Sequence, residues 1–227
     1  MVAAWHIGPA ATWLPPVRRV LWPALDGRGR ADHVALTFDD GPDPVSTPLF
    51  LDTLDRLGVR ATFFVLGRPL RRDPWVAREL VARGHEVAVH GWEHRRPWRP
   101  GPRRDLRETG WAVEAVTEVC GTPPRWYRPP YGILTGGLWA AARHHGLRPV
   151  LWSAWGRDWV AGATARGVLD TLAPGLRGGA TVLLHDSDRT SAPRSWQATH
   201  AALPALISRC RELGLTVGPL SDHQVDG

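Results

Sequence analysis

Short apolar runs alternate with amphipathic stretches along most of this 227-residue chain. The apolar runs are rich in β-branched and aromatic residues and are bounded by glycine or proline, which is typical of buried strands. The stretches between them carry apolar residues at helical spacing and mostly end at a glycine, which is typical of helices. Strands are predicted at residues 33–36, 61–66, 86–90, 126–128, 148–154, 180–185 and 215–220. Helices are predicted at residues 46–57, 73–83, 103–120, 138–145, 165–172 and 195–213.

Strand and helix therefore alternate about seven times. Alternation of this kind predicts an α/β fold with a parallel sheet. No linker, low-complexity segment or repeat divides the chain, so a single domain is predicted. If the sheet closes into a barrel, its chemistry belongs on the loops that follow the carboxyl end of each strand.

Two adjacent carboxylates, Asp39 and Asp40, stand where the first predicted strand ends, and Gly41 and Pro42 stop that strand. Side chains on an unbent strand point to opposite faces, so a turn is needed to bring both carboxylates to one site. Like charges this close are costly without a cation or a strong donor between them. One interpretation is that one aspartate binds a metal ion and the other acts as a base beside it. The alternative is a turn or helix-capping pair.

Further polar side chains fall at the ends of later predicted strands. They are His90 and His94, Arg128 and Tyr131, Asp158 and Trp159, and His185 and Asp186. Because the carboxyl ends of parallel strands meet at one edge of a sheet, we expect these groups to lie together. This convergence favours the metal-site interpretation of the aspartate pair.

The segment 90–94 (HGWEH) carries two imidazoles four residues apart. In a helical turn both would face one way and could bind one metal ion together with a carboxylate, leaving positions open for water. A rival hypothesis is the H-x-x-E-H motif of inverted zinc proteases, with Glu93 as the general base. That motif needs a sustained helix, which Gly91 and Pro97 oppose, and it leaves the aspartate pair without a role. Two surface histidines are the third possibility.

Five segments together resemble the polysaccharide deacetylase family, also called the NodB-homology or carbohydrate esterase 4 family. In the family's order they are residues 37–43 (TFDDGPD), 90–94 (HGWEH), 128–132 (RPPYG), 158–159 (DW) and 183–186 (LLHD). The resemblance implies a single-domain, distorted (β/α)7-type barrel. Residues 31–222 would form this catalytic domain, and residues 1–30 an N-terminal extension packed on it. One departure is Gly91, where the family usually has Ser or Thr.

The resemblance also implies a metal site and a base. The metal ligands would be Asp40, His90 and His94. The cofactor would be a divalent metal, zinc first, with cobalt, nickel or iron as alternatives that the same donor atoms suit. Asp39 would be the general base, and Arg128 would pair with it and fix its orientation.

An acid and a substrate groove follow from the same resemblance. His185 would be the general acid, with Asp158 supporting its charged form, and the backbone N–H of Tyr131 would help to hold the oxyanion. The substrate-binding groove would be lined by Trp159, Leu183, Pro130 and Tyr131. Core packing is expected for most tryptophans, with one or two of Trp92, Trp98, Trp155, Trp159 and Trp196 stacking on a sugar ring from the rim loops.

These parts match the needs of amide hydrolysis: a metal-activated water, a base, positive charge at the oxyanion and an acid for the amine leaving group. The predicted function is a metal-dependent hydrolase of linear amide C–N bonds. It would remove an N-acyl group, N-acetyl in the first place, from an amino sugar or a related compound. Two alternatives stay open, a deacylase of a small intracellular N-acyl metabolite and a non-catalytic glycan- or anion-binding barrel.

Charge and composition change this picture little. All 28 basic residues are arginine, and the net charge of +6 with a pI near 10.7 suits an anionic partner. The arginines are scattered and no nucleic-acid motif accompanies them, so nucleic acid is not a predicted partner. No apolar run approaches membrane-spanning length. The N-terminus lacks a basic start and a clear cleavage site, which predicts a cytoplasmic location.

Overall fold

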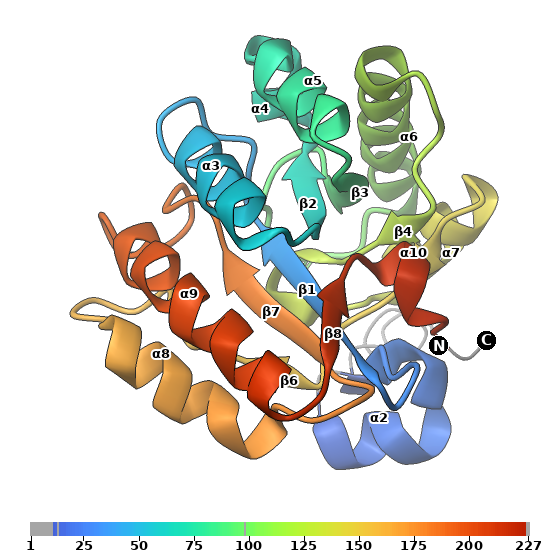
Figure 1. Ribbon diagram of the computed structural model, residues 1–227. Coiled ribbons are helices and arrows are strands. Elements are labelled where there is room, and N and C mark those ends of the chain that lie inside the picture. Colours follow the sequence, from blue (N-terminus) through green and yellow to red (C-terminus); the bar gives the residue numbers. More distant parts are fainter. Residues whose placement is uncertain (1–10, 13, 98, 226–227) are drawn as a thin grey trace.

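The computed structural model describes residues 11–12, 14–97 and 99–225. Its strands form one parallel sheet in the order β5-β4-β3-β2-β1-β7-β6, and β8 also pairs with β1 (Figure 1). The strands are β1 His33–Asp39, β2 Thr62–Leu66, β3 Glu86–Gly91, β4 Trp126–Tyr127, β5 Arg148–Pro149, β6 Ala154–Trp155, β7 Thr181–His185 and β8 Thr216–Gly218. The predicted α/β class, with a curled parallel sheet in one domain, is confirmed.

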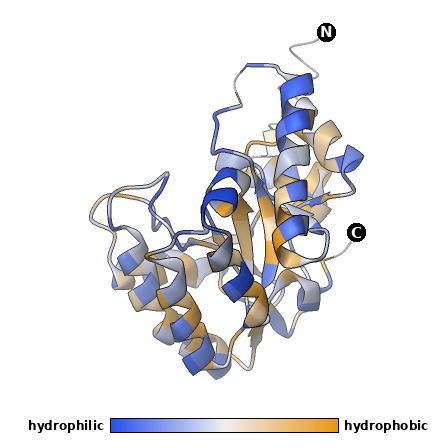
Figure 2. Ribbon diagram, turned by 90° about the horizontal axis from the view of Figure 1, so that it is seen from above, coloured by the Kyte–Doolittle hydropathy of each residue, from blue (hydrophilic) through white to orange (hydrophobic). Residues whose placement is uncertain are grey.

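Most of the helices cover the outer face of the curled sheet (Figure 1). The helices are α2 Pro15–Leu21, α3 Thr47–Leu57, α4 Gly67–Arg72, α5 Pro74–Ala82, α6 Pro102–Cys120, α7 Gly136–His144, α8 Ala165–Leu172, α9 Trp196–Glu212 and α10 Leu220–His223. Short 3-10 turns are η2 Pro23–Asp26, η3 Pro130–Gly132 and η4 Ala173–Gly175. The hydrophobic colours of Figure 2 gather on the central strands and on the helix faces turned toward them. Among the described residues, no helix has both the length and the apolar character that crossing a membrane requires.

The first strand shows how the sheet separates core from chemistry. All seven residues of β1 are buried, because one side faces the helices and the other faces the barrel interior. Leu36 and Phe38 point to the helix side, where Phe38 packs on Phe50 and Phe63 at ring-centroid distances of 5.3 and 5.0 Å. The alternate residues Thr37 and Asp39 point inward. Asp39 is the last residue of β1, so it reaches the carboxyl edge of the sheet.

The predicted strand at residues 148–154 is wrong in one respect, because two short strands, β5 and β6, replace it. These strands lie at opposite ends of the sheet order. Pro149 has no N–H to donate to a ladder. The next two carbonyls, of Val150 and Leu151, accept hydrogen bonds from the Arg128 guanidinium instead of from a strand. The chain therefore crosses the seam between β5 and β6 without forming a strand there.

The segment before β1 packs into this seam. The N–H of Leu151 donates to the carbonyl of Leu25 at 2.9 Å, and Arg18 donates to the carbonyl of Trp152 at 2.8 Å. Arg18 is buried and pairs with Asp26 at 2.8 Å. Residues 14–30 thus contact the barrel wall, whereas the prediction for residues 1–10 and 13 lies outside the described residues.

Candidate active site

The two neighbouring aspartates of the first motif face the same cavity although they are adjacent in the chain. Asp40 has a φ of 77°, a left-handed conformation that turns the backbone directly after β1. Both carboxylates are almost fully buried, Asp39 at 2% and Asp40 at 1% exposure. In the sheet, Asp39 lies in register with His185 of β7. The predicted convergence is therefore observed, and Asp40 itself makes the turn.

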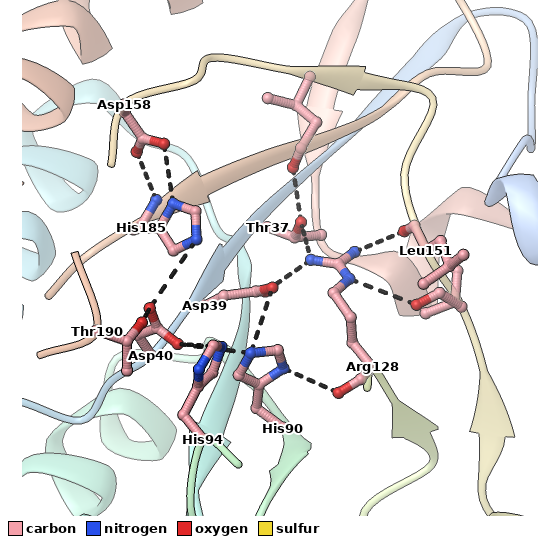
Figure 3. Close-up of polar contacts among 12 residues, drawn as sticks. Thr37, Asp39, Asp40, His90, His94, Arg128, Leu151, Asp158, His185 and Thr190 are labelled. Carbon is pink, nitrogen blue, oxygen red and sulfur yellow. Dashed lines mark hydrogen bonds and ion pairs between the residues drawn. The ribbon is translucent and has the colours of Figure 1, made fainter. Parts of the chain in front are cut away.

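Asp40, His90 and His94 form a compact group of metal-ligand type (Figure 3). Their donor atoms all lie within 4.8 Å of one another. One oxygen, Asp40 Oδ1, lies 3.5 Å from His90 Nε2 and 3.6 Å from His94 Nε2. His90 Nδ1 lies 2.8 Å from the carbonyl oxygen of Arg128, which can only accept, so Nδ1 carries the proton. The lone pair of His90 Nε2 then faces Asp40 Oδ1.

The chemistry of this group fits a divalent cation. Asp40 Oδ1 is buried and has no hydrogen-bond partner among the described residues, a costly state unless a positive group sits against it. Burial lowers the pKa of His94 to about 4, so its ring is neutral at pH 7 and can donate a lone pair. Burial alone would raise the pKa of Asp40, but its contacts with the His90, His185 and His94 rings hold this pKa well below its usual range. Two imidazoles and a carboxylate are the donor set of catalytic zinc sites.

Residues 90–94 do not form the helical turn that would let both imidazoles face one way, yet the two rings still converge. His90 is the extra residue of a bulge, since Val65 pairs with Val89 and Leu66 pairs with Gly91. A bulge re-aims a side chain in this way without any helix. Glu93 forms ion pairs with Arg68 and Arg95, so the inverted-protease hypothesis has neither its helix nor its base.

Gly91 stands where the family usually has Ser or Thr, and its backbone explains the glycine. Its φ is +107°, a conformation that residues with a side chain rarely adopt. A Cβ atom at this position would lie 3.7 Å from the carbonyl oxygen of Glu93 and from Pro130, which is ordinary contact. The loop therefore requires glycine for its backbone conformation rather than for space.

Arg128 holds Asp39 from below the cavity. The guanidinium is fully buried and donates to Asp39 Oδ1 at 2.7 Å and to the Thr37 hydroxyl at 2.8 Å. It also lies 4.0 Å from the ring centroid of Phe64. Because every direction around it is occupied, Arg128 fixes one oxygen of Asp39. The other oxygen, Oδ2, faces His90 Nε2 at 3.8 Å.

His185 and Asp158 form a second polar pair across the cavity (Figure 3). Asp158 Oδ1 accepts from His185 Nδ1 at 2.8 Å, and its Oδ2 accepts from the His185 backbone N–H and the Thr199 hydroxyl at 2.7 and 2.6 Å. Burial alone would lower the pKa of His185. The Asp158 carboxylate, with smaller contributions from Asp40 and Asp39, raises this pKa to about 10. His185 is therefore protonated at neutral pH, and its Nε2 lies 4.0 Å from Asp40 Oδ2.

A cavity of about 670 Å³ is lined by Asp39, Asp40, His90, His94 and His185. Of the predicted groove residues, Trp159, Leu183 and Tyr131 line it, whereas Pro130 is buried behind Gly91 and does not. Trp152 and Trp155 extend the same apolar wall, and the Trp155 ring lies 6.2 Å from Trp152 and 5.2 Å from Trp159. Below, these three tryptophans are called the indole wall. Of the other tryptophans considered, Trp92 and Trp196 pack against the core, and Trp98 lies outside the described residues.

Thr190 has a place in the site that the sequence does not reveal, and Asp186 has contacts there that its motif does not reveal. The Thr190 hydroxyl donates to Asp40 Oδ2, which leaves Oδ1 to face the histidines. Asp186, placed at the rim without a role, is fully buried and accepts from the Thr47 hydroxyl. Burial raises the pKa of Asp186 to about 7. No motif marks Thr190, because it stands in an irregular loop.

Comparison with known proteins now identifies the family. The sequence profile described as Polysaccharide deacetylase matches residues 26–150, more than half of the chain. The chain belongs to the polysaccharide deacetylase family. The predicted resemblance is thereby confirmed.

Relatives in this deacetylase family match most of the chain. A chitooligosaccharide deacetylase of Bradyrhizobium sp. (strain ANU 289) is 39% identical over 198 residues, covering 82% of this chain and 88% of that protein. A chitooligosaccharide deacetylase of Sinorhizobium fredii (strain NBRC 101917 / NGR234) is 36% identical over 200 residues, covering 85% and 92%. The solved structure of a peptidoglycan N-acetylglucosamine deacetylase in complex with 4-naphthalen-1-yl-N-oxidanyl-benzamide has a TM-score of 0.79 at 28% identity, covering 87% and 91%. Membership of this family makes the chain a hydrolase of amide C–N bonds.

Proposed function

We propose that this protein is a metal-dependent N-deacetylase that acts on an N-acetylated amino sugar within an oligosaccharide or polysaccharide. The observation that carries the proposal is the arrangement around one cavity. Asp40, His90 and His94 converge at its base, Asp39 stands on one side of them, and His185 stands on the other. Each part that amide hydrolysis needs has a candidate within reach of the same space.

The metal would be held by Asp40, His90 and His94. When bound, such an ion lowers the pKa of a coordinated water and polarises the carbonyl of the substrate. The chain's own residues support this use: the Arg128 carbonyl fixes the tautomer of His90, and the Thr190 hydroxyl fixes the orientation of Asp40. The donor set suits zinc, and also cobalt, nickel or iron.

Asp39 would accept the proton of the attacking water. Its Oδ1 is held by Arg128, so its Oδ2 stays on the side of the metal ligands. A base with one fixed oxygen keeps the other within reach of a water in the cavity. The rigidity of Arg128 thus serves the geometry of the base.

His185 would donate a proton to the amine leaving group. It is protonated at neutral pH because Asp158 stabilises the imidazolium, and its Nε2 faces the cavity. Tyr131 would complete the site with its backbone N–H toward the oxyanion. In support, Tyr131 has a φ of 60° and its ring lies 4.3 Å from that of His94 at the cavity wall.

The substrate class rests on the relatives and on the shape of the site. Two relatives are named chitooligosaccharide deacetylases, and a structural neighbour is named a peptidoglycan N-acetylglucosamine deacetylase. The indole wall and Leu183 supply the apolar surface against which an acetyl methyl group and a sugar face can pack. This favours a glycan over a small metabolite. The filled set of ligand, base and acid positions favours an enzyme over a binding barrel.

Acetate release tests the proposal. The purified protein would be treated with a chelator, reloaded with one metal at a time, and assayed on chitooligosaccharides, peptidoglycan fragments and free N-acetylglucosamine. We expect no acetate after chelation and release from at least one glycan after reloading. Turnover that is unchanged by chelation would contradict the metal role, and activity on the free sugar alone would favour the small-metabolite alternative.

A further inference from the structure

A second cavity opens beside the metal-site cavity. It has a volume of about 550 Å³ and shares His94 and Thr190 with the first. Its lining carries three arginines, Arg68, Arg72 and Arg189, and we call this cavity the arginine cleft. The Thr190 hydroxyl donates a hydrogen bond to Asp40, so the cleft lies directly beside the candidate metal ligands.

The arginines of α4 are weakly engaged. The side chains of Arg68 and Arg72 are 68% and 62% exposed and pair with Glu93 and Asp73. Exposed ion pairs contribute little to stability, because water solvates both partners and screens the attraction. Arg68 also shares Glu93 with Arg95. These guanidinium groups can therefore exchange their present partner for another anion at little cost.

Arg189, in the loop after β7, also lines the cleft, and its side chain is 25% exposed. Its two contacts, to the carbonyl of Pro42 and to Asp43 Oδ2, are both long at 3.3 Å. Asp43 is already engaged, since its Oδ1 accepts the backbone N–H groups of Val45 and Ser46 before α3. The positive charge of Arg189 is thus only partly compensated.

One more arginine stands at the rim of the metal-site cavity. Arg96 lines that cavity, is exposed, and lies 5.8 Å from the ring centroid of Tyr131. Within the described part of the chain it forms no ion pair. Arginine side chains therefore line both cavities that His94 borders, and Trp159 of the indole wall lies against His185.

We propose that the arginine cleft is a subsite for an anionic group, a carboxylate or a phosphate, that the glycan carries beside its N-acetylated sugar. This inference rests on the proposed function. Planar guanidinium groups bind carboxylate and phosphate oxygens through paired hydrogen bonds, which a neutral sugar hydroxyl cannot match. The net charge of +6 would also draw an acidic glycan toward the protein. The preferred substrate is therefore an acidic N-acetylated glycan.

The test compares matched oligosaccharides of equal length and acetylation, one neutral, one carrying carboxylates and one carrying phosphates. We expect the native enzyme to have a higher kcat/KM on an acidic substrate, and this advantage to shrink with added salt. In the Arg68→Gln/Arg72→Gln double variant the ratio of acidic to neutral kcat/KM should fall about fivefold to tenfold, through KM. The carboxylate and phosphate arms show which anion the cleft prefers.

Arg166 on α8 offers a matched control, because it is 85% exposed and pairs with Asp170. The Arg166→Gln variant should leave the ratio unchanged. Calorimetric titration of each oligosaccharide into the protein reports binding without turnover. Equal binding and equal kcat/KM for neutral and acidic substrates, unchanged in the double variant, would overturn the subsite while leaving the deacetylase function standing. Arginine-dependent binding of the acidic substrate without any acetate release would support the subsite and contradict the proposed function.

Discussion

Two buried arginine–aspartate pairs hold the same stretch of chain, residues 150–152, by its carbonyls. Arg18 pairs with Asp26 at 2.8 Å on the N-terminal side of the seam. Arg128 pairs with Asp39 at 2.7 Å on the side of the cavity. Both arginines are at most 3% exposed. The two pairs are chemically alike, but the second carboxylate oxygen of each aspartate faces different groups.

The difference separates a structural pair from a site. Both oxygens of Asp26 face arginines, Oδ1 facing Arg18 and Oδ2 facing Arg28 and Arg19 at 2.9 and 3.5 Å. Asp39 gives Oδ1 to Arg128, and its Oδ2 faces the metal-site cavity. A carboxylate surrounded by donors on both sides has no capacity for a proton or a water. A carboxylate held on one side is oriented and still reactive.

Replacing each aspartate with asparagine should give the largest difference between the two pairs. We expect Asp39→Asn to lower kcat by about 10²–10⁴-fold, the range for loss of a general base, while metal content stays unchanged. Asp26→Asn should lower the melting temperature but keep kcat per folded molecule. Acetate release measures kcat, metal analysis measures metal content, and calorimetry measures the melting temperature of both variants. Full activity in Asp39→Asn would refute the assignment of the base.

Removing each arginine should test whether one pair serves catalysis or both pairs serve stability alone. Arg128→Met and Arg18→Met each leave a buried carboxylate short of its donor, which costs about 3–5 kcal/mol of unfolding free energy. We expect both losses in denaturant unfolding, and a loss of kcat only in Arg128→Met. If Arg18→Met lowered kcat equally in protein that is still folded, the distinction between the two pairs would be wrong.

Thr190 should affect the metal rather than the fold. Thr190→Val removes the donor to Asp40 Oδ2, so we expect metal affinity to fall about 10–100-fold, the usual effect of losing a partner behind a ligand. Thr190→Ser keeps the hydroxyl and should restore most of the affinity. Competition with a chelating dye measures both. Equal metal affinity in the valine and native proteins would contradict the role of the hydroxyl.

Asp158 should shift the pH profile. The pKa of His185 is raised to about 10, mainly by Asp158, so the acid form is present below that pH and is lost as the pH rises through it. A cation on Asp40 would cancel part of that carboxylate's charge and bring the pKa down somewhat. Asp158→Asn removes the main support, so the alkaline fall of kcat should move about 1–3 pH units lower. An unmoved alkaline limb would show that His185 is not the acid.

The regular parts of the fold follow from sequence pattern, and the broken parts do not. β1 and β7 are short apolar runs in a sheet buried on both faces. The strands predicted at residues 33–36 and 180–185 therefore coincide with them. The break after Pro149 depends on Arg128, which lies over twenty residues earlier in the chain and takes the carbonyls. The helix α4 was likewise not predicted, because Gly67 marked a strand end and α4 begins there.

The site was predictable where strand ends carry its residues. Asp39 and His185 end neighbouring strands, so topology alone brings them side by side. His90 joins them through a bulge, a feature that the i, i+4 spacing did not reveal. Thr190 contributes from an irregular loop, where no periodicity constrains position. Strand order therefore locates Asp39 and His185, motif resemblance locates loop residues such as His94, and a loop residue outside every motif, such as Thr190, is missed.

The segment before β1, which packs into the seam between β5 and β6, has a practical consequence for anyone who shortens or fuses this chain. The family match begins at residue 26, and the barrel was expected from residue 31, so both borders fall after α2. A fragment cut at either border would lose Arg18 and leave the Trp152 carbonyl without its donor, beside one edge of the indole wall. Expression borders drawn from sequence similarity would thus remove part of the barrel wall. A fragment or chimera should start ahead of Pro15 to keep these contacts and the stability that they contribute.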